Sequence, residues 1–240
     1  PSFIEGDPIS VPHRFRKMQD REIAGLFSAT LAWGQRQTTI NNSLKLLERM
    51  DNDPHAFLLG AGDAEFRIAE DFVHRTFNGT DAGYFLRFLS RFYQSHQSLE
   101  EAFAPGFNSG GAKQALTDFN RLFFQYPDAP QRTRKHVPNP ERHSACKRLN
   151  MFLRWMVRRD GKGVDLGCWT SIDPSKLMCP LDVHVERVAR RLGLLRGRMK
   201  GWETVEALTA RLRRFDPADP VRYDFALFGI GVMDKKGLQA

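Results

Sequence analysis

Cysteine is scarce in this 240-residue chain, which has only Cys146, Cys168 and Cys179. An odd set without a Cys-x-x-Cys pair excludes a disulfide framework and a four-cysteine iron–sulfur cluster within one chain. It favours a reducing, cytoplasmic setting. The histidines are scattered along the chain, so we expect no zinc site and no other metal site.

Long apolar runs are also missing. No run approaches the roughly 18 to 20 residues of a transmembrane helix. The first residues lack the basic and apolar regions of a signal peptide. We therefore expect no membrane partner. We also expect a monomer. Because the chain opens with Pro1 rather than Met, we also expect a short native segment before it.

Acidic residues are fewer than basic ones, with 28 Asp and Glu against 36 Lys and Arg, a net charge of +8. A basic surplus favours polyanionic partners, which are DNA, RNA or anionic lipid, and charge alone does not choose among them. The hydrophobic fraction of 41% suffices for one compact domain, or for two lobes that share a core.

Strand signals are scarce, and apolar residues recur at helical spacing through most of the chain, which predicts an all-α fold. The expected helices span residues 19–32, 37–50, 54–59, 112–124, 144–158, 183–192, 201–214 and 219–232, with three short helices within 63–100. Asp20 and the Ser98–Glu101 capping box are expected at helix starts, and residues 106–111 form a link. The Pro-rich stretch 126–143 is the clearest internal boundary.

Residues 181–194 place Asp182 where a helix N-cap belongs. Its carboxylate would accept hydrogen bonds from first-turn N–H groups, and a purely capping role is the simplest interpretation. The segment also resembles the Asp-x-His-Val/Met-x-Arg-Val-x-Arg-Arg-Leu-Gly-Leu signature of the helix-hairpin-helix DNA glycosylases, the endonuclease III and 8-oxoguanine glycosylase superfamily. That resemblance implies that Asp182 is a catalytic carboxylate. The DNA contacts that we expect come from His184, Arg187, Arg190, Arg191 and Arg148.

Bifunctional members of that superfamily use a nucleophilic lysine upstream of the aspartate, and the resemblance implies Lys147. It lies in the first turn of the predicted helix 144–158, where the helix dipole and Arg148 disfavour a charged amine. A solvated helix lysine is the alternative. Lys147 and Asp182 are 35 positions apart, and no Gly-x-Gly precedes the lysine. Both features are closer to the archaeal 8-oxoguanine glycosylases, whose hairpin is atypical.

Asp224 and Phe228 are four residues apart in the last predicted helix and therefore share one face. The archaeal glycosylases carry Asp and Trp at this spacing, which implies that Asp224 hydrogen-bonds an extruded base and Phe228 stacks on it. The alternative is that Phe228 is core and Asp224 a surface or capping residue. Residues 31–38 resemble a segment in which a glutamine reads the lesion or fills its gap, which indicates Gln35, with Trp33 as a stacking wall.

The whole chain resembles an uncharacterised bacterial family, DUF2400, through residues 3–9, 144–158 and 223–227. Taken together, the resemblances imply a helix-hairpin-helix DNA glycosylase-like fold with two helical lobes around a central cleft and an atypical hairpin. We expect a single domain over 1–240, with one lobe formed by residues 30–135 and the other by 1–29 plus 136–240.

The function that these resemblances imply is base-excision repair. An oxidised purine, 8-oxoguanine first, would be cut from damaged duplex DNA, and the abasic site opened by β-elimination, without metal or cofactor. Such a protein would work in the cytoplasm, on the nucleoid. A catalytically silent nucleic-acid-binding protein, a monofunctional enzyme, and a glycosylase for another lesion or an RNA base remain open. The hypothesis requires Lys147 and Asp182 to face one cleft, with Asp224 and Phe228 on its wall.

Overall fold

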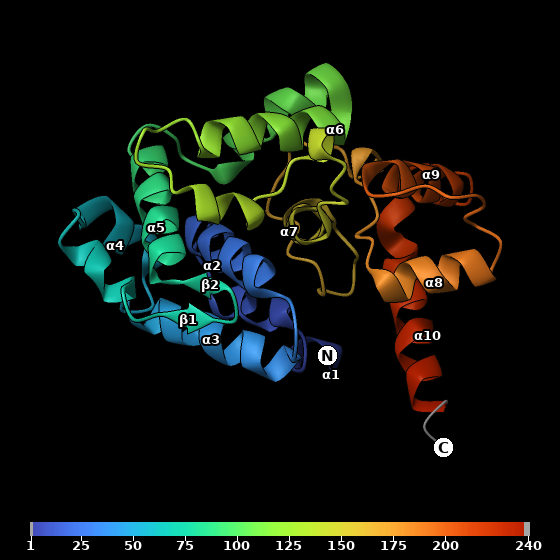
Figure 1. The fold of residues 1–240 in the computed structure, drawn as a ribbon, viewed down its shortest axis with the longest axis horizontal. Helices are drawn as coiled ribbons and strands as arrows, with labels where there is room; N and C mark the ends of the chain where they lie inside the picture. The colour runs from blue at the N-terminus through green and yellow to red at the C-terminus, as the bar shows by residue number, and fades with distance from the viewer. Residues whose placement is uncertain (1, 238–240) are drawn as a thin grey trace.

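The computed structural model describes residues 2–237, with side chains for residues 4–231, and it is nearly all helical (Figure 1). The predicted all-α class is confirmed. The α-helices are α1 (Ser2–Glu5), α2 (Met18–Leu31), α3 (Arg36–Glu48), α4 (Pro54–Gly60), α5 (Gly79–Tyr93), α6 (Ala104–Phe123), α7 (Lys147–Val157), α8 (Val183–Arg191), α9 (Trp202–Arg213) and α10 (Asp224–Gly237).

Short 3-10 helices fill many of the connections. They are η1 (Pro8–Ser10), η2 (Pro12–Arg14), η3 (Glu65–Ala69), η4 (Leu99–Ala102), η5 (Gln131–Lys135), η6 (Pro140–Arg142), η7 (Pro174–Lys176) and η8 (Pro220–Tyr223). The Pro-rich boundary at 126–143 contains only two such turns, in agreement with its composition.

Three predicted elements differ from the structure. The helix expected from residue 112 already begins at Ala104, and the predicted link survives only as a kink, where Gly111 has a φ of +73°. The last predicted helix starts as the 3-10 turn η8 before α10. Within 63–100 three helical elements are present, η3, the long helix α5 and the start of η4, but a two-stranded hairpin that was not predicted lies between η3 and α5, in which β1 (Val73–His74) pairs antiparallel with β2 (Phe77–Asn78). Strands of two residues are too short to show an alternating pattern.

The capping predictions have mixed outcomes. The Ser98–Glu101 capping box is present, at the start of η4, and Asp182 caps α8. The prediction for Asp20 was wrong, because α2 starts after Lys17 without a side-chain cap. The Asp20 carboxylate instead accepts a hydrogen bond of 2.9 Å from the backbone N–H of His55, in the first turn of α4. A tertiary contact therefore replaces the expected local one.

The core is continuous and rich in phenylalanine. Helix α2 is buried on nearly every side and packs against both α3 and α7. The predicted apolar stripe of α5 is buried, and its Phe85 and Phe88 rings pack on Phe123 of α6 at 4.7 Å and 4.3 Å between ring centroids. The packing of α2 against α3 and α7 joins the helices on one side of the core.

The elements gather in two groups on either side of α7, which is seen end-on in Figure 1. Helices α2 to α5 lie on one side, and α8, α9 and α10 on the other, with α8 packed on α10. The predicted lobe boundaries at residues 30 and 135 remain a prediction. Among the described residues, none of the helices combines the length and apolarity needed to cross a membrane.

Candidate active site

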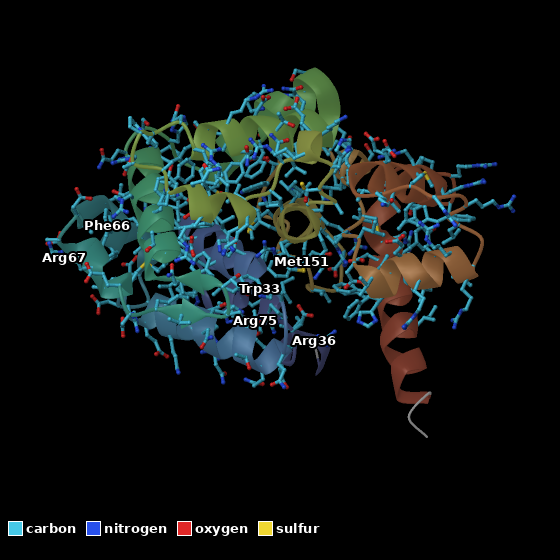
Figure 2. All side chains as sticks on the ribbon, in the orientation of Figure 1. Trp33, Arg36, Phe66, Arg67, Arg75 and Met151 are labelled. Carbon is cyan, nitrogen blue, oxygen red and sulfur yellow. The ribbon has the colours of Figure 1, made fainter. Side chains whose placement is uncertain are left out.

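A cavity of about 790 Å³ lies between α7, the start of α8, α10, the turn from α2 to α3 and the η1 segment. Seven of the predicted site residues line it, and they come from four separate segments: Trp33, Lys147, Arg148, Asp182, His184, Asp224 and Phe228. Trp33, Arg36 and Met151, which also line the cavity, lie near one another in Figure 2. The geometric requirement stated from the sequence is therefore met.

Lys147 is the first residue of α7 and points into this cavity. The preceding Cys146 has a φ of 48°, a left-handed conformation that starts the helix abruptly. Among residues 4–231, the half-buried Lys147 amine has neither a hydrogen bond nor an ion pair. Its charge lowers the pKa of both Asp7 and Asp224, so it lies within electrostatic range of both carboxylates. The amine thus shares a cavity with the carboxylates of Asp7 and Asp224 and, among the described residues, is paired with neither.

Asp182 is fixed by the helix that it caps. One carboxylate oxygen, Oδ1, accepts hydrogen bonds of 2.9 Å from the backbone N–H groups of His184 and Val185. Its second oxygen has no partner within residues 4–231. The Asp182 charge also raises the pKa of Asp224. A carboxylate anchored through one oxygen can present the other, in a set orientation, to a positive charge in the cavity.

Arg154 and Asp224 form the floor. The Arg154 side chain is 1% exposed, and its guanidinium is ion-paired with Asp224 and, at 3.2 Å, with Asp165. Arg158 holds the same Asp165 oxygen at 2.7 Å. Burial raises the pKa of Asp224, an effect that Arg154 and Lys147 oppose. The other oxygen of Asp224 lies 4.0 Å from the Cys179 sulfur. Asp224 is therefore buried and already partnered on the cavity floor.

Phe228 lies between two neighbours. The Arg36 guanidinium carbon is 4.9 Å from the centre of the Phe228 ring, and the His184 ring meets it edge-on at 6.3 Å. Because Arg36 comes from α3 and Phe228 from α10, this contact joins the two sides of the cavity. An exposed cation–π contact contributes about 0.5–1 kcal/mol, so a stacking ligand can displace it.

Trp33 and Arg148 support each other at the cavity wall. The Trp33 ring stacks on His136 at 5.7 Å, and the Arg148 guanidinium lies over it at 4.7 Å. Arg148 donates hydrogen bonds to the carbonyl oxygens of Thr30 and Lys135, at 2.5 Å and 3.2 Å. Burial lowers the pKa of Arg148 to about 10. Arg148 therefore connects α7 to two other segments, whatever else it contacts.

The remaining predicted residues lie outside the cavity lining. Arg187 donates to the carbonyl oxygen of Gly231 at 2.7 Å, and Arg190 pairs with Glu186 at 2.7 Å. Arg191 and Gln35 are exposed. Gln35 is the residue before α3, and its neighbour Arg36 is the side chain that lines the cavity. The resemblance located this segment but not which of its side chains faces inward.

Three charged residues of the cavity were missed from the sequence: Asp7, Arg36 and Arg154. Asp7 precedes Pro8 and reads locally as a simple cap. Arg154 is one of several basic residues in a strongly amphipathic helix, and its position on the buried face was its only signal. In the part of the chain that the structure describes, no group of His, Cys, Asp and Glu side chains is arranged to hold a metal ion.

Comparison with known proteins identifies the family. No curated protein and no solved structure matches the chain. Residues 7–233 match the model of the family described as protein of unknown function, DUF2400. The match includes every residue that lines the cavity, from Asp7 to Phe228. The chain belongs to the DUF2400 family.

Proposed function

We propose that this protein is a DNA base-excision enzyme, a glycosylase with β-lyase activity on an oxidised purine, and that its fold is related to the helix-hairpin-helix glycosylases. One observation carries the proposal. The Lys147 amine, which has no partner among residues 4–231, shares a cavity with the anchored carboxylate of Asp182. An available amine that shares a cavity with an anchored carboxylate is what Schiff-base chemistry on a sugar needs. The net charge of +8 suits a DNA substrate, which would place the protein on the nucleoid.

The proposed reaction starts from a base extruded into the cavity. As the bond from C1′ to the base nitrogen breaks, the base takes the electron pair and positive charge develops on the sugar. The free oxygen of Asp182 stabilises that charge. The Lys147 nitrogen bonds to C1′, and one of its N–H protons moves to O4′ as the C1′–O4′ bond breaks and the sugar ring opens, which gives a protonated imine. Loss of a C2′ proton then expels the 3′ phosphate, which breaks the strand.

The cavity offers suitable contacts for the extruded base. Phe228 provides an aromatic face, and Trp33 a second aromatic wall. Stacking of a base on an aromatic side chain contributes about 1–3 kcal/mol. An oxidised purine, 8-oxoguanine first, is the substrate that we propose. The Lys147–Asp182 spacing and the Asp224 and Phe228 pair resemble the archaeal 8-oxoguanine glycosylases, and this likeness supports that choice.

Borohydride trapping tests the proposal. Duplexes that contain 8-oxoguanine or an abasic site are incubated with the wild type, Lys147→Gln and Asp182→Asn. We expect a covalent band from the wild type, none from Lys147→Gln, and much slower formation in Asp182→Asn. Lys45→Gln is the matched control, because Lys45 is an exposed lysine of α3 that lies outside the cavity lining.

The outcome without trapping is also informative. If no oxidised, alkylated or abasic strand gives a covalent band, the lyase chemistry is wrong. Base release without trapping would indicate a monofunctional enzyme. Salt-sensitive DNA binding that is unchanged in Lys147→Gln and Asp182→Asn would indicate a nucleic-acid-binding protein without this chemistry.

A further inference from the structure

Asp7 holds a fixed place at the edge of the cavity. It is the N-cap of η1, and its Oδ1 accepts a hydrogen bond of 3.1 Å from the backbone N–H of Ile9. The segment behind it is anchored, because Ser28 donates to the carbonyl oxygen of Pro8 at 2.6 Å and Ile9 is fully buried. The half-buried carboxylate therefore has little freedom to turn away from the cavity that it lines.

The carboxylates of the cavity are not equally available to a ligand. Asp224 is buried and committed to Arg154, with the Cys179 sulfur near its other oxygen. Asp182 is anchored at the start of α8, where the proposed chemistry uses its free oxygen. Asp7 uses one oxygen for its cap, and the second has no hydrogen-bond or ion-pair partner within residues 4–231. Asp7 is thus the carboxylate left to contact a bound base.

The surroundings of Asp7 suit an acceptor for neutral N–H donors. Burial raises the pKa of its carboxyl, and the charges of Arg36, Lys147 and Arg154 offset part of that rise. All three of these basic residues line the same cavity as Asp7, and Arg36 is the one whose guanidinium covers Phe228. An ionised carboxylate only accepts hydrogen bonds, so it favours a ligand edge that carries adjacent donors.

We propose that Asp7 is a specificity-determining residue whose free oxygen accepts hydrogen bonds from the ring N1–H and the exocyclic amine of a guanine-type base. Asp224 is then a floor residue that positions Arg154, and its contact with the base is not needed. This inference rests on the proposed function, since it names the feature of the base that the same cavity selects. A lost hydrogen bond to a charged acceptor lowers discrimination by about 10- to 100-fold.

The test compares two lesions that differ by one group. Base release is measured from duplexes that carry 8-oxoguanine or 8-oxohypoxanthine, which lacks the exocyclic amine. We expect the wild type to prefer 8-oxoguanine by about 10- to 100-fold, and Asp7→Asn to lose that preference. Asparagine caps a helix as well as aspartate does, so the variant keeps the local structure.

A matched control separates specificity from capping. Asp173 caps η7 in the same way: it precedes Pro174, and its carboxylate accepts a hydrogen bond of 2.8 Å from the backbone N–H of Ser175. Asp173 lies outside the cavity lining. Asp173→Asn should keep the wild-type preference. Trapping on a preformed abasic site should be the same in all three proteins, because that substrate has no base to select.

Three results would overturn the inference: an unchanged preference in Asp7→Asn, no preference in an active wild type, or slower trapping of the abasic site in Asp7→Asn. The third would mean that Asp7 acts on Lys147. If the wild type releases no base at all, the proposed function fails separately. In that case, calorimetry measures the binding of 8-oxoguanosine and 8-oxoinosine to the wild type and to Asp7→Asn, which tests the role of Asp7 without catalysis. If the wild type binds 8-oxoguanosine more tightly than 8-oxoinosine and Asp7→Asn abolishes this difference, the role proposed for Asp7 is supported. If the wild type binds the two nucleosides equally, or binds neither, that role is contradicted.

Discussion

Replacing Arg154 by leucine tests the account of the cavity floor. In the described residues, Asp224 would lose its ion-pair partner, whereas Asp165 would keep Arg158 at 2.7 Å. Breaking a buried ion pair from one side costs about 3–5 kcal/mol. For a chain of this size, each kcal/mol lowers the Tm by about 2–4 °C. Arg154→Leu should therefore lower the Tm at pH 7 by about 6–20 °C.

The pH dependence of that loss identifies its cause. Burial raises the pKa of Asp224 above its ordinary value, and loss of Arg154 raises it further. A carboxyl with a raised pKa in the folded state destabilises the fold where it is ionised, and this penalty fades as the pH falls and the group protonates. The Arg154→Leu variant should thus recover part of its lost Tm as the pH is lowered from neutral toward 5. Adding Asp224→Asn should also restore part of it at pH 7.

Thermal denaturation followed by circular dichroism measures both effects. Arg121→Leu is the control, because Arg121 pairs with Glu141 at 3.3 Å on the surface, where such pairs contribute about 0–1 kcal/mol. The reasoning is refuted if Arg154→Leu loses no more stability than Arg121→Leu. It is also refuted if the loss is the same at every pH.

Three further predictions concern the other cavity residues. Asp182→Ala should lower the Tm by about 2–4 °C, because it removes a helix cap of about 1 kcal/mol. Asp182→Asn should keep the Tm of the wild type and slow borohydride trapping. Equal Tm values for the two variants would contradict the capping role. Phe228→Ala should weaken binding to an 8-oxoguanine duplex by about 5- to 150-fold through lost stacking and leave abasic-site binding unchanged, as measured by fluorescence anisotropy. Asp7→Asn should raise the Tm at pH 7, because it removes an ionised group whose pKa is raised by burial. This gain should shrink as the pH falls toward the ordinary range of the carboxyl. A lower Tm at pH 7 would contradict the view that the Asp7 carboxylate is kept at a cost in stability.

Periodic and capping signals predicted much of the fold. The apolar stripe of α5 and the Asp182 cap of α8 depend only on residues close together in the chain, so they can be predicted from the sequence. The hairpin of β1 and β2 was missed because two-residue strands leave no pattern, and Asp20 was misassigned because its partner is 35 positions away. Spacing and resemblance predicted that Lys147, Asp182, Asp224 and Phe228 would share a cavity.

What the sequence did not predict depends on contacts between distant segments. Asp7 reaches the cavity only because the N-terminal segment packs back against α2 and α3, which no local pattern near Asp7 indicates. Arg36, the first residue of α3, lines the cavity, whereas Gln35 precedes the helix with an extended backbone and is exposed, and the sequence pattern did not locate this helix start to the residue. The Arg154–Asp224 pair joins α7 to α10 across 70 positions.

The most direct test of the central claim is to locate the covalent bond. The borohydride-reduced complex with an abasic duplex is digested, and the modified peptide is identified by mass spectrometry. The account predicts one adduct, on the Nζ of Lys147, that is absent in Lys147→Gln and unchanged in Lys45→Gln. An adduct on any other amine, or none with any abasic or oxidised strand, would contradict the assignment of Lys147 as the nucleophile.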